Sequence, residues 1–155
     1  MHHDINKIFA CSDSTDFVIS MISHLCDKSN YGDNMEKLSP AEQIFFICTI
    51  LEQEVNNGGF DQFFCNSSGN FANRIVDAFL TIGAEEIASI CKDALAAFPE
   101  SLPEDWAERQ EYLDETSTEE IQDILSACDD RFYEYPEDLE NLCYQYALSH
   151  KEQFC

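Results

Sequence analysis

Apolar residues recur at the three- and four-residue spacing of an α-helix along nearly the whole chain, and no segment of useful length alternates as a β-strand does. The clearest helix start is Ser39, with Pro40 at the first helical position and Glu42 three residues after the serine. The apolar stripe that follows consists of Ile44, Ile47, Cys48, Leu51 and Val55. The sequence therefore predicts an all-α fold, a single-domain helical bundle of about seven or eight helices.

The 155 residues are predicted to form one domain, because a chain of this length builds a single hydrophobic core. Residues 1–37 should supply an N-terminal helix, over 13–27, and a loop of that same domain. Residues 38–155 contain the remaining helices and a strongly acidic segment, 100–140. Further helices are predicted over 70–82, from Glu85, from a cap formed by Ser117 and Glu120, and from Pro136.

The helical pattern stops at two adjacent glycines, Gly58 and Gly59, and resumes as a short helix from Phe60 to Asn66. A phosphate-binding loop would need the spacing of a P-loop and a nearby cation, but the closest basic residue is Arg74. A corner needs only a positive φ after the first helix, which either glycine can supply. We therefore favour a structural corner over a ligand-binding loop.

The residues beside the two glycines are assigned mainly to packing. Phe60 and Phe63 are expected to cover the corner with apolar surface, and Gln62 and Asn66 to bond the backbone groups that the bend exposes. The predicted structural motif consists of Asn57, Gly58, Gly59, Phe60, Gln62, Phe63 and Asn66.

The net charge of the chain is −23, from 31 acidic and eight basic residues. Direct binding of nucleic acid or of a membrane surface is disfavoured, because both depend on Lys and Arg. A basic protein, including one that binds DNA, is the kind of partner that such a charge attracts. The acidity is concentrated from Glu100 to Glu140, where sixteen acidic residues face only Arg109 and Arg131, a net charge of −14.

This acidic segment keeps a helical pattern, weakly at Trp106, Gln110 and Leu113 and strongly from Ile121 to Phe132. At about 1.5 Å of helix per residue it carries roughly one carboxylate every 4 Å. Each strand of duplex DNA carries one charge about every 3.4 Å, so the two densities are comparable. Carboxylates three or four residues apart, such as Glu104, Glu108 and Glu111, are expected on one helix face. The predicted partner-binding face consists of Glu104, Asp105, Glu108, Glu111, Asp114, Glu115, Glu119, Glu120 and Asp123.

Residues 57–66, with the pattern N-G-G-F-x-Q-F-F-x-N, resemble the signature of a bacterial domain-of-unknown-function family that includes a neisserial DNA-mimic protein. The closing segment is also similar, in D-D-R-F-Y at 129–133 and in the series Leu142, Tyr146, His150 and Phe154. The likeness covers residues 38–155 and implies an all-helical fold, no known catalysis and, as one possible assembly, a homodimer. In the neisserial relative an acidic surface imitates duplex DNA and occupies a helix-turn-helix transcription factor. The shared signature includes no surface carboxylate, so mimicry here depends on this chain's own charge.

The leading hypothesis is an acidic protein-binding module, a DNA mimic that occupies the DNA-binding surface of a basic protein such as a transcription factor. One alternative is an immunity or anti-nuclease protein, which would use the same electrostatics against a toxin. Another is a helical domain of unknown role whose acidity serves solubility only.

An enzyme is not favoured. The eight cysteines contain no C-x-x-C pair and several lie on apolar helical stripes, which indicates reduced core thiols and no metal site. His24 and His150 stand at no recognisable catalytic spacing from a Cys or an Asp. A cysteine-dependent enzyme remains the alternative, although acidic surroundings should raise thiol pKa values. We expect no catalytic residue and no cofactor.

No segment resembles a signal peptide, because the apolar patch from Ile8 to Cys11 is only four residues long. The longest apolar run, Ile44 to Leu51, is too short to cross a bilayer. A cytoplasmic protein is therefore expected.

Overall fold

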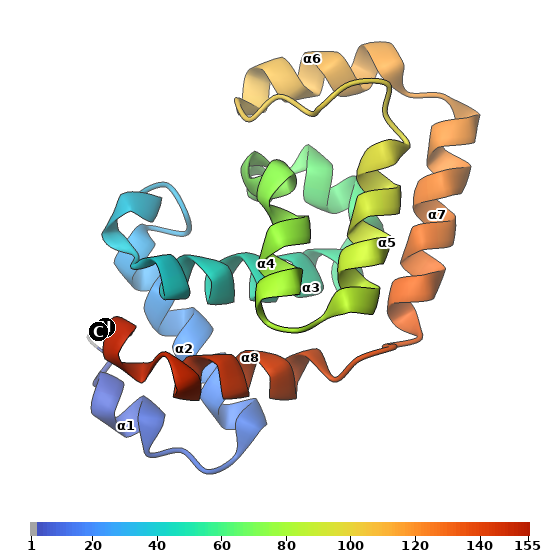
Figure 1. The fold of residues 1–155 in the computed structure, drawn as a ribbon. Helices are drawn as coiled ribbons and strands as arrows, with labels where there is room; N and C mark the ends of the chain where they lie inside the picture. The colour runs from blue at the N-terminus through green and yellow to red at the C-terminus, as the bar shows by residue number, and fades with distance from the viewer. Residues whose placement is uncertain (1–2) are drawn as a thin grey trace.

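Helix α3, Pro40–Cys65, runs through the middle of the molecule and the other helices are arranged around it (Figure 1). The computed structural model describes residues 3–155, and within them the chain forms eight α-helices and no strand, which confirms the all-α prediction. The other α-helices are α1 Ile5–Phe9, α2 Ser14–Ser29, α4 Ile75–Thr81, α5 Glu85–Ala96, α6 Trp106–Thr116, α7 Glu119–Tyr133 and α8 Leu139–Ser149. Three short 3₁₀ helices are η1 Met35–Lys37, η2 Ser67–Arg74 and η3 Lys151–Gln153.

Helix α3 begins as its sequence predicts and supplies much of the core. Ser39 accepts a hydrogen bond from the Glu42 amide while the Glu42 carboxylate accepts one from the Ser39 amide, which is a capping box. Helices α4 and α7 pack along its C-terminal half, with α5 packed against both of them, and α2 and α8 pack along its N-terminal half. The buried apolar residues of α3 include Phe45, Phe46, Cys48, Leu51, Val55, Phe60, Phe63 and Phe64.

Three predicted helix boundaries are wrong, each for a local reason. The segment predicted as one helix over 70–82 is the 3₁₀ helix η2 followed by α4, since its polar Ser-Ser-Gly-Asn start favours tighter turns. Helix α7 is capped by Thr118, whose hydroxyl accepts from the Ile121 amide, and Ser117 lies outside it. Helix α8 begins three residues after Pro136, where Asp138 accepts from the Asn141 amide. Helix α1 was not predicted.

The cysteines of the core are reduced thiols, as predicted. All eight are free, and Cys48, Cys91, Cys128 and Cys143 are buried. Burial raises the pKa of Cys143 to about 12 and also raises the pKa of the other three buried thiols. These four side chains therefore act as small apolar groups.

Candidate protein-binding surface

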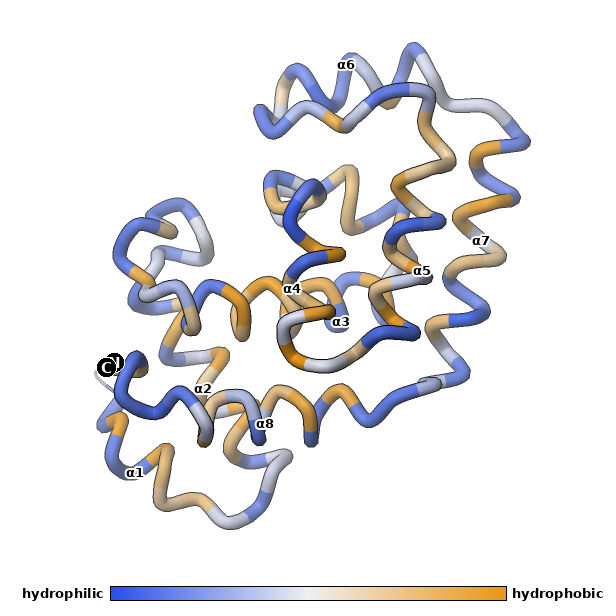
Figure 2. Tube along the Cα trace, in the orientation of Figure 1, coloured by the Kyte–Doolittle hydropathy of each residue, from blue (hydrophilic) through white to orange (hydrophobic). Residues whose placement is uncertain are grey.

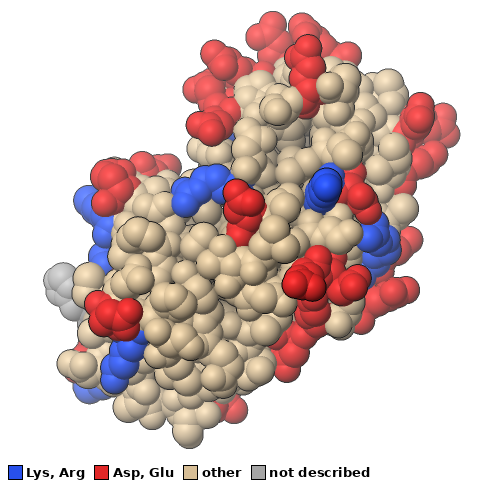
Figure 3. Space-filling view, viewed as in Figure 1, with Lys and Arg blue, Asp and Glu red and all other residues tan. Residues whose placement is uncertain are grey.

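The acidic surface lies on α6, on the turn before it and on the first turns of α7. Helix α6 crosses one end of the molecule and α7 runs down the adjoining side, so the two helices meet at a corner (Figure 1). Figure 3 shows acidic side chains gathered over α6 and over the start of α7. All nine predicted residues are exposed: Glu104, Asp105, Glu108, Glu111, Asp114, Glu115, Glu119, Glu120 and Asp123.

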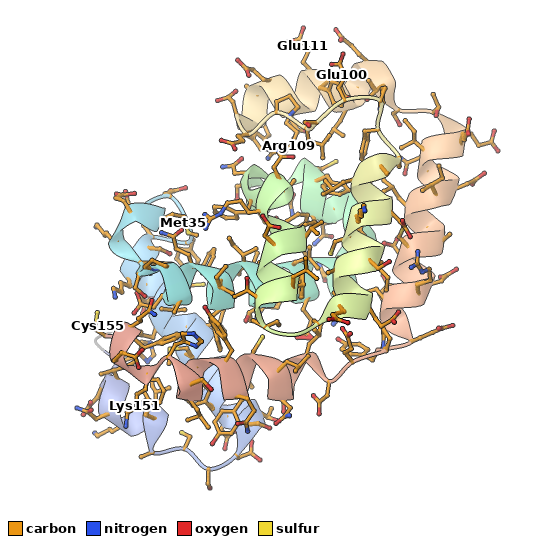
Figure 4. All side chains as sticks on the ribbon, viewed as in Figure 1. Met35, Glu100, Arg109, Glu111, Lys151 and Cys155 are labelled. Atoms are coloured by element: carbon orange, nitrogen blue, oxygen red, sulfur yellow. The ribbon has the colours of Figure 1, made fainter. Side chains whose placement is uncertain are left out.

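On α6 the acidic residues occupy the face opposite to the one that contacts the body. Glu108, Glu111 and Glu115 follow one another at three- and four-residue steps, which places them along one outward face. Figure 4 shows Glu111 directed away from the body and Arg109, from the same helix, directed toward it. The trace of α6 is also mostly hydrophilic (Figure 2).

Two of the predicted residues differ from their expected setting. Glu104 precedes the helix and does not continue the stripe of Glu108 and Glu111, because α6 begins at Trp106. Asp105 is the N-cap, and its carboxylate accepts a hydrogen bond from the Glu108 amide at 3.0 Å. Asp105 therefore stabilises the helix start as well as contributing charge to the surface.

None of the nine carboxylates forms a salt bridge with another described residue. The salt bridges found within residues 3–155 join Lys28 to Glu42, Arg131 to Asp93 and His3 to Asp27. Asp93 lies outside the acidic segment, so Arg131 neutralises a carboxylate of α5 instead. The nine exposed carboxylates therefore lack a salt-bridge partner among the described residues.

The remaining arginine of the segment, Arg109, is fully buried and anchors α6 through backbone carbonyls. Its Nε donates to the Phe64 carbonyl at 2.7 Å, and one terminal nitrogen donates to the Asn66 carbonyl at 2.8 Å. Its other terminal nitrogen donates to the carbonyls of Pro103 and Glu104. Burial lowers the pKa of the guanidinium, but arginine stays charged at any physiological pH.

The C-terminal end of α3 is a suitable place for a buried cation. The last carbonyls of a helix have no partner within the helix and carry the negative end of its dipole. Trp106 and Gln110 also donate to one of them, the Cys65 carbonyl, at 3.1 and 2.7 Å. Trp106 is 53% exposed, so this residue and Gln110 hold α6 by hydrogen bonds more than by the apolar stripe that was predicted.

Gly69 makes room for this arrangement. A Cβ atom on Gly69 would lie 2.6 Å from the Phe64 carbonyl oxygen and 2.7 Å from Arg109 Nε. The position is therefore restricted to glycine by the close approach of backbone and guanidinium. No pattern in the sequence indicates this role.

The predicted corner at Gly58 and Gly59 is confirmed. Both residues leave the helical conformation inside α3, and Gly59 has φ 78° and ψ 179°, a region that essentially only glycine occupies. The bend frees the Phe60 amide, and Asp129 of α7 accepts its hydrogen bond at 2.8 Å. Burial raises the pKa of Asp129, and the bond from Phe60 opposes this shift.

The polar residues of the motif have partners other than those predicted. Gln62 and Asn66 do not bond the free backbone at the bend, because both donate to the carboxylate of Glu54, one α3 turn before the corner. Asn57 donates to the Gln62 side chain at 3.2 Å. The free backbone amide of the bend, that of Phe60, donates instead to Asp129, which lies 69 residues further along the chain. This contact was not predicted.

The two segments that carry the family resemblance form one structural unit. Asp129 bonds the Phe60 amide, and Phe132 packs edge to face against the Phe60 ring with centroids 6.1 Å apart. A family model for the DMP19-like proteins matches residues 36–150, about three-quarters of the chain. The chain belongs to this family. No curated protein and no solved structure matches the chain.

The match includes the whole acidic surface. The family model does not reach α1 or α2, which precede residue 36. Among residues 3–155, no helix combines the length and the apolar character that a membrane span requires.

His24 and Cys155 come together in the fold but do not form a nucleophile and base. His24 Nε2 lies 2.8 Å from the Cys155 carbonyl oxygen, so the imidazole meets the main chain and not the thiol. Lys28 Nζ lies 3.1 Å from Cys155 Sγ but also bonds both oxygens of the buried Glu42 carboxylate. This cluster fixes the end of the chain against α2 and α3. Within the described residues, no group of three or more His, Cys, Asp or Glu could hold a metal ion.

Proposed function

We propose that this protein is an acidic protein-binding module of the DNA-mimic kind. In this proposal α6 and the first turns of α7 occupy the DNA-binding surface of a basic protein, such as a transcription factor. The observation that carries the proposal is the set of nine exposed carboxylates on these elements, none of which forms a salt bridge with a described residue.

Two features suit the surface to imitation of a polynucleotide. Side chains at three- and four-residue steps on a helix have Cβ atoms about 5–6 Å apart, so their carboxylates form a row of negative charges, as the phosphates of a DNA strand do. Arg109, Trp106 and Gln110 fix α6 to the end of α3, so its charges keep a defined position relative to α7. A fixed array attracts a basic partner without the entropy cost of ordering a flexible acidic tail.

Membership in the DMP19-like family supports the same proposal, because that family includes a DNA-mimic protein. The partner is proposed only by its chemistry: a protein with a surface rich in Lys and Arg that normally contacts DNA phosphates. Such a complex should weaken steeply as ionic strength rises, since the Debye length falls to about 10 Å at 0.1 M salt.

The test is capture of partners from the native cell at low salt, followed by elution with increasing salt. The test variant carries Glu108→Gln, Glu111→Gln and Glu115→Gln, which removes three charges from the outward face of α6. The matched control carries Asp77→Asn, Glu85→Gln and Glu152→Gln, which removes three exposed charges elsewhere. We expect a specific DNA-binding protein to elute from the test variant at clearly lower salt than from the control and the unchanged protein.

Equal elution from both variants would show that total charge, not the α6 surface, determines binding. Capture of abundant basic proteins without preference would also refute mimicry and leave solubility as the role of the acidity.

A further inference from the structure

A small cavity beside the family motif has the chemistry of a cation-binding site. It encloses about 190 Å³ between the end of α2, the middle of α3 and η2. Pockets for drug-sized ligands hold about 300–1,000 Å³, so this cavity suits a single small head group. Its lining includes one carboxylate, Glu54, and three aromatic rings, those of Tyr31, Phe46 and Phe71. The rest of the lining is uncharged: Cys26, Ile50, Ser67 and Ser68.

The carboxylate of Glu54 is held in place by neutral donors. Gln62 Nε2 donates to it at 2.6 Å, Asn66 Nδ2 at 3.1 Å and Ser68 Oγ at 3.3 Å. An ionised carboxylate is an acceptor only, so these three donors suit its charged form. No Lys, Arg or His lines the cavity, and Glu54 takes part in none of the salt bridges among residues 3–155. The cavity therefore contains an oriented negative charge without a cation.

The three aromatic rings line the same cavity as this carboxylate. Phe46 and Phe71 meet edge to face with centroids 5.9 Å apart. Gly32 lies against both rings, since a Cβ there would be 3.2 Å from each. Tyr31, beside it, is 73% exposed and has φ 57°, a conformation that bulky residues rarely adopt. The backbone thus holds a large aromatic side chain at the rim of the cavity, where it is only loosely packed.

We propose that this cavity binds the guanidinium or ammonium group of a small organic cation or of a protein side chain. The carboxylate would accept charge-assisted hydrogen bonds from the cation, and the ring faces would add cation–π attraction. None of the residues that line the cavity belongs to α6 or α7, and the proposal does not depend on the proposed DNA mimicry. An experiment can therefore refute cation binding without refuting DNA mimicry, and can refute DNA mimicry without refuting cation binding.

The direct test is an NMR titration of the isotope-labelled protein with methylguanidinium, in 0.3 M NaCl to suppress general attraction to the acidic surface. Methylurea, an uncharged molecule of nearly the same shape, is the matched control ligand. We expect saturable shifts of the Glu54, Ser68 and Phe71 amides with methylguanidinium and none with methylurea. The peptide Gly-Arg-Gly distinguishes the two sources of the cation: binding as tight as that of methylguanidinium indicates a protein side chain, and clearly weaker binding indicates a free small molecule.

Two variants locate the binding. Glu54→Gln should weaken methylguanidinium binding by more than about tenfold, because it removes the only charge in the cavity. Tyr31→Ala should weaken it about three- to tenfold through lost cation–π attraction. Tyr31→Ala removes an exposed ring, so it tests the proposal even if Glu54→Gln fails to fold. Leu80→Ala, at another exposed side chain, is its control. Equal shifts with methylurea, shifts confined to α6 and α7, or unchanged binding by Tyr31→Ala would overturn the proposal.

Discussion

Helices α3 and α6 are held in the same molecule by different forces. Helix α3 buries eight or more apolar side chains, whereas Arg109 is the one buried residue of α6. Helix α3 is stabilised by removal of apolar surface from water, which is not directional. Helix α6 is stabilised largely by hydrogen bonds from three side chains to the last carbonyls of α3, which fix its position and its rotation.

This difference explains how an acidic helix can be well positioned while its outward face carries charged side chains. An apolar stripe wide enough to hold α6 would occupy positions that are now acidic. A buried guanidinium supplies several bonds from one residue, so Arg109, with the half-buried Tyr112 and Leu113, holds α6 without a wide apolar stripe. Phe64 takes part in both apolar burial and hydrogen bonding, since its ring lies in the core and its carbonyl accepts a hydrogen bond from Arg109.

The largest loss of stability is expected when a buried ring of the core, that of Phe64, is removed. Phe64→Ala should lower the free energy of unfolding by about 3–5 kcal/mol, because the ring is fully buried and contacts Phe60, Phe63 and Phe98. Urea denaturation followed by circular dichroism measures the loss. All helices should lose stability together, and a loss confined to α6 would contradict a shared core.

The hydrogen bonds that hold α6 to the end of α3 are tested by replacing Arg109. Arg109→Met should cost about 3 kcal/mol, because it leaves the carbonyls of Phe64 and Asn66 without their charged donor. Amide hydrogen exchange should show loss of protection mainly in α6. The control is Arg131→Met, which breaks the exposed ion pair with Asp93 and should cost less than about 1 kcal/mol. Equal costs for the two arginines would mean that α6 does not depend on Arg109.

A smaller loss of stability is expected from a substitution at the corner within α3. Gly59→Ala should cost about 2–3 kcal/mol, since Gly59 has φ 78° and a Cβ there would collide with the Asp129 carboxylate. Gly83→Ala is the matched control, because Gly83 has φ 87° but its nearest neighbour would be 4.0 Å away. Thermal unfolding of both variants should show the smaller loss for Gly83→Ala, and the reverse order would exclude the collision as the cause.

The smallest effect on stability is expected at the outward face of α6. Glu108→Gln, Glu111→Gln and Glu115→Gln together should raise the melting temperature by no more than about 3 °C at low salt, through relief of like-charge repulsion. The gain should vanish at high salt, because exposed charges are then screened. A marked loss of stability would show that these carboxylates have a structural role and are not simply a binding surface.

The sequence predicted best where a structure depends on neighbours along the chain. Ser39, Pro40 and Glu42 predicted a helix start that the structure confirms, since capping involves residues three apart. The two glycines predicted a corner because its main requirement, a positive φ, is a property of one residue. Boundaries failed where two capping signals competed, as at Ser117 and Thr118.

The hydrogen-bond partners of polar side chains could not be predicted. Gln62 and Asn66 were expected to bond the backbone of the bend, yet they bond Glu54, and the bend is satisfied by Asp129. From the sequence, Arg109 is recognisable only as a positive charge in an acidic segment. No local pattern distinguishes an arginine that pairs with carboxylates from one that bonds the carbonyls at the end of another helix.

The sequence by itself determined the helical fold class and the concentration of negative charge between residues 100 and 140, because periodicity and composition are local properties. Tertiary structure alone decided that Arg109 turns inward, that Asp129 bonds the corner and that nine carboxylates remain exposed without a salt bridge to a described residue. These outcomes depend on contacts between residues tens of positions apart, and such contacts are set by how the helices pack.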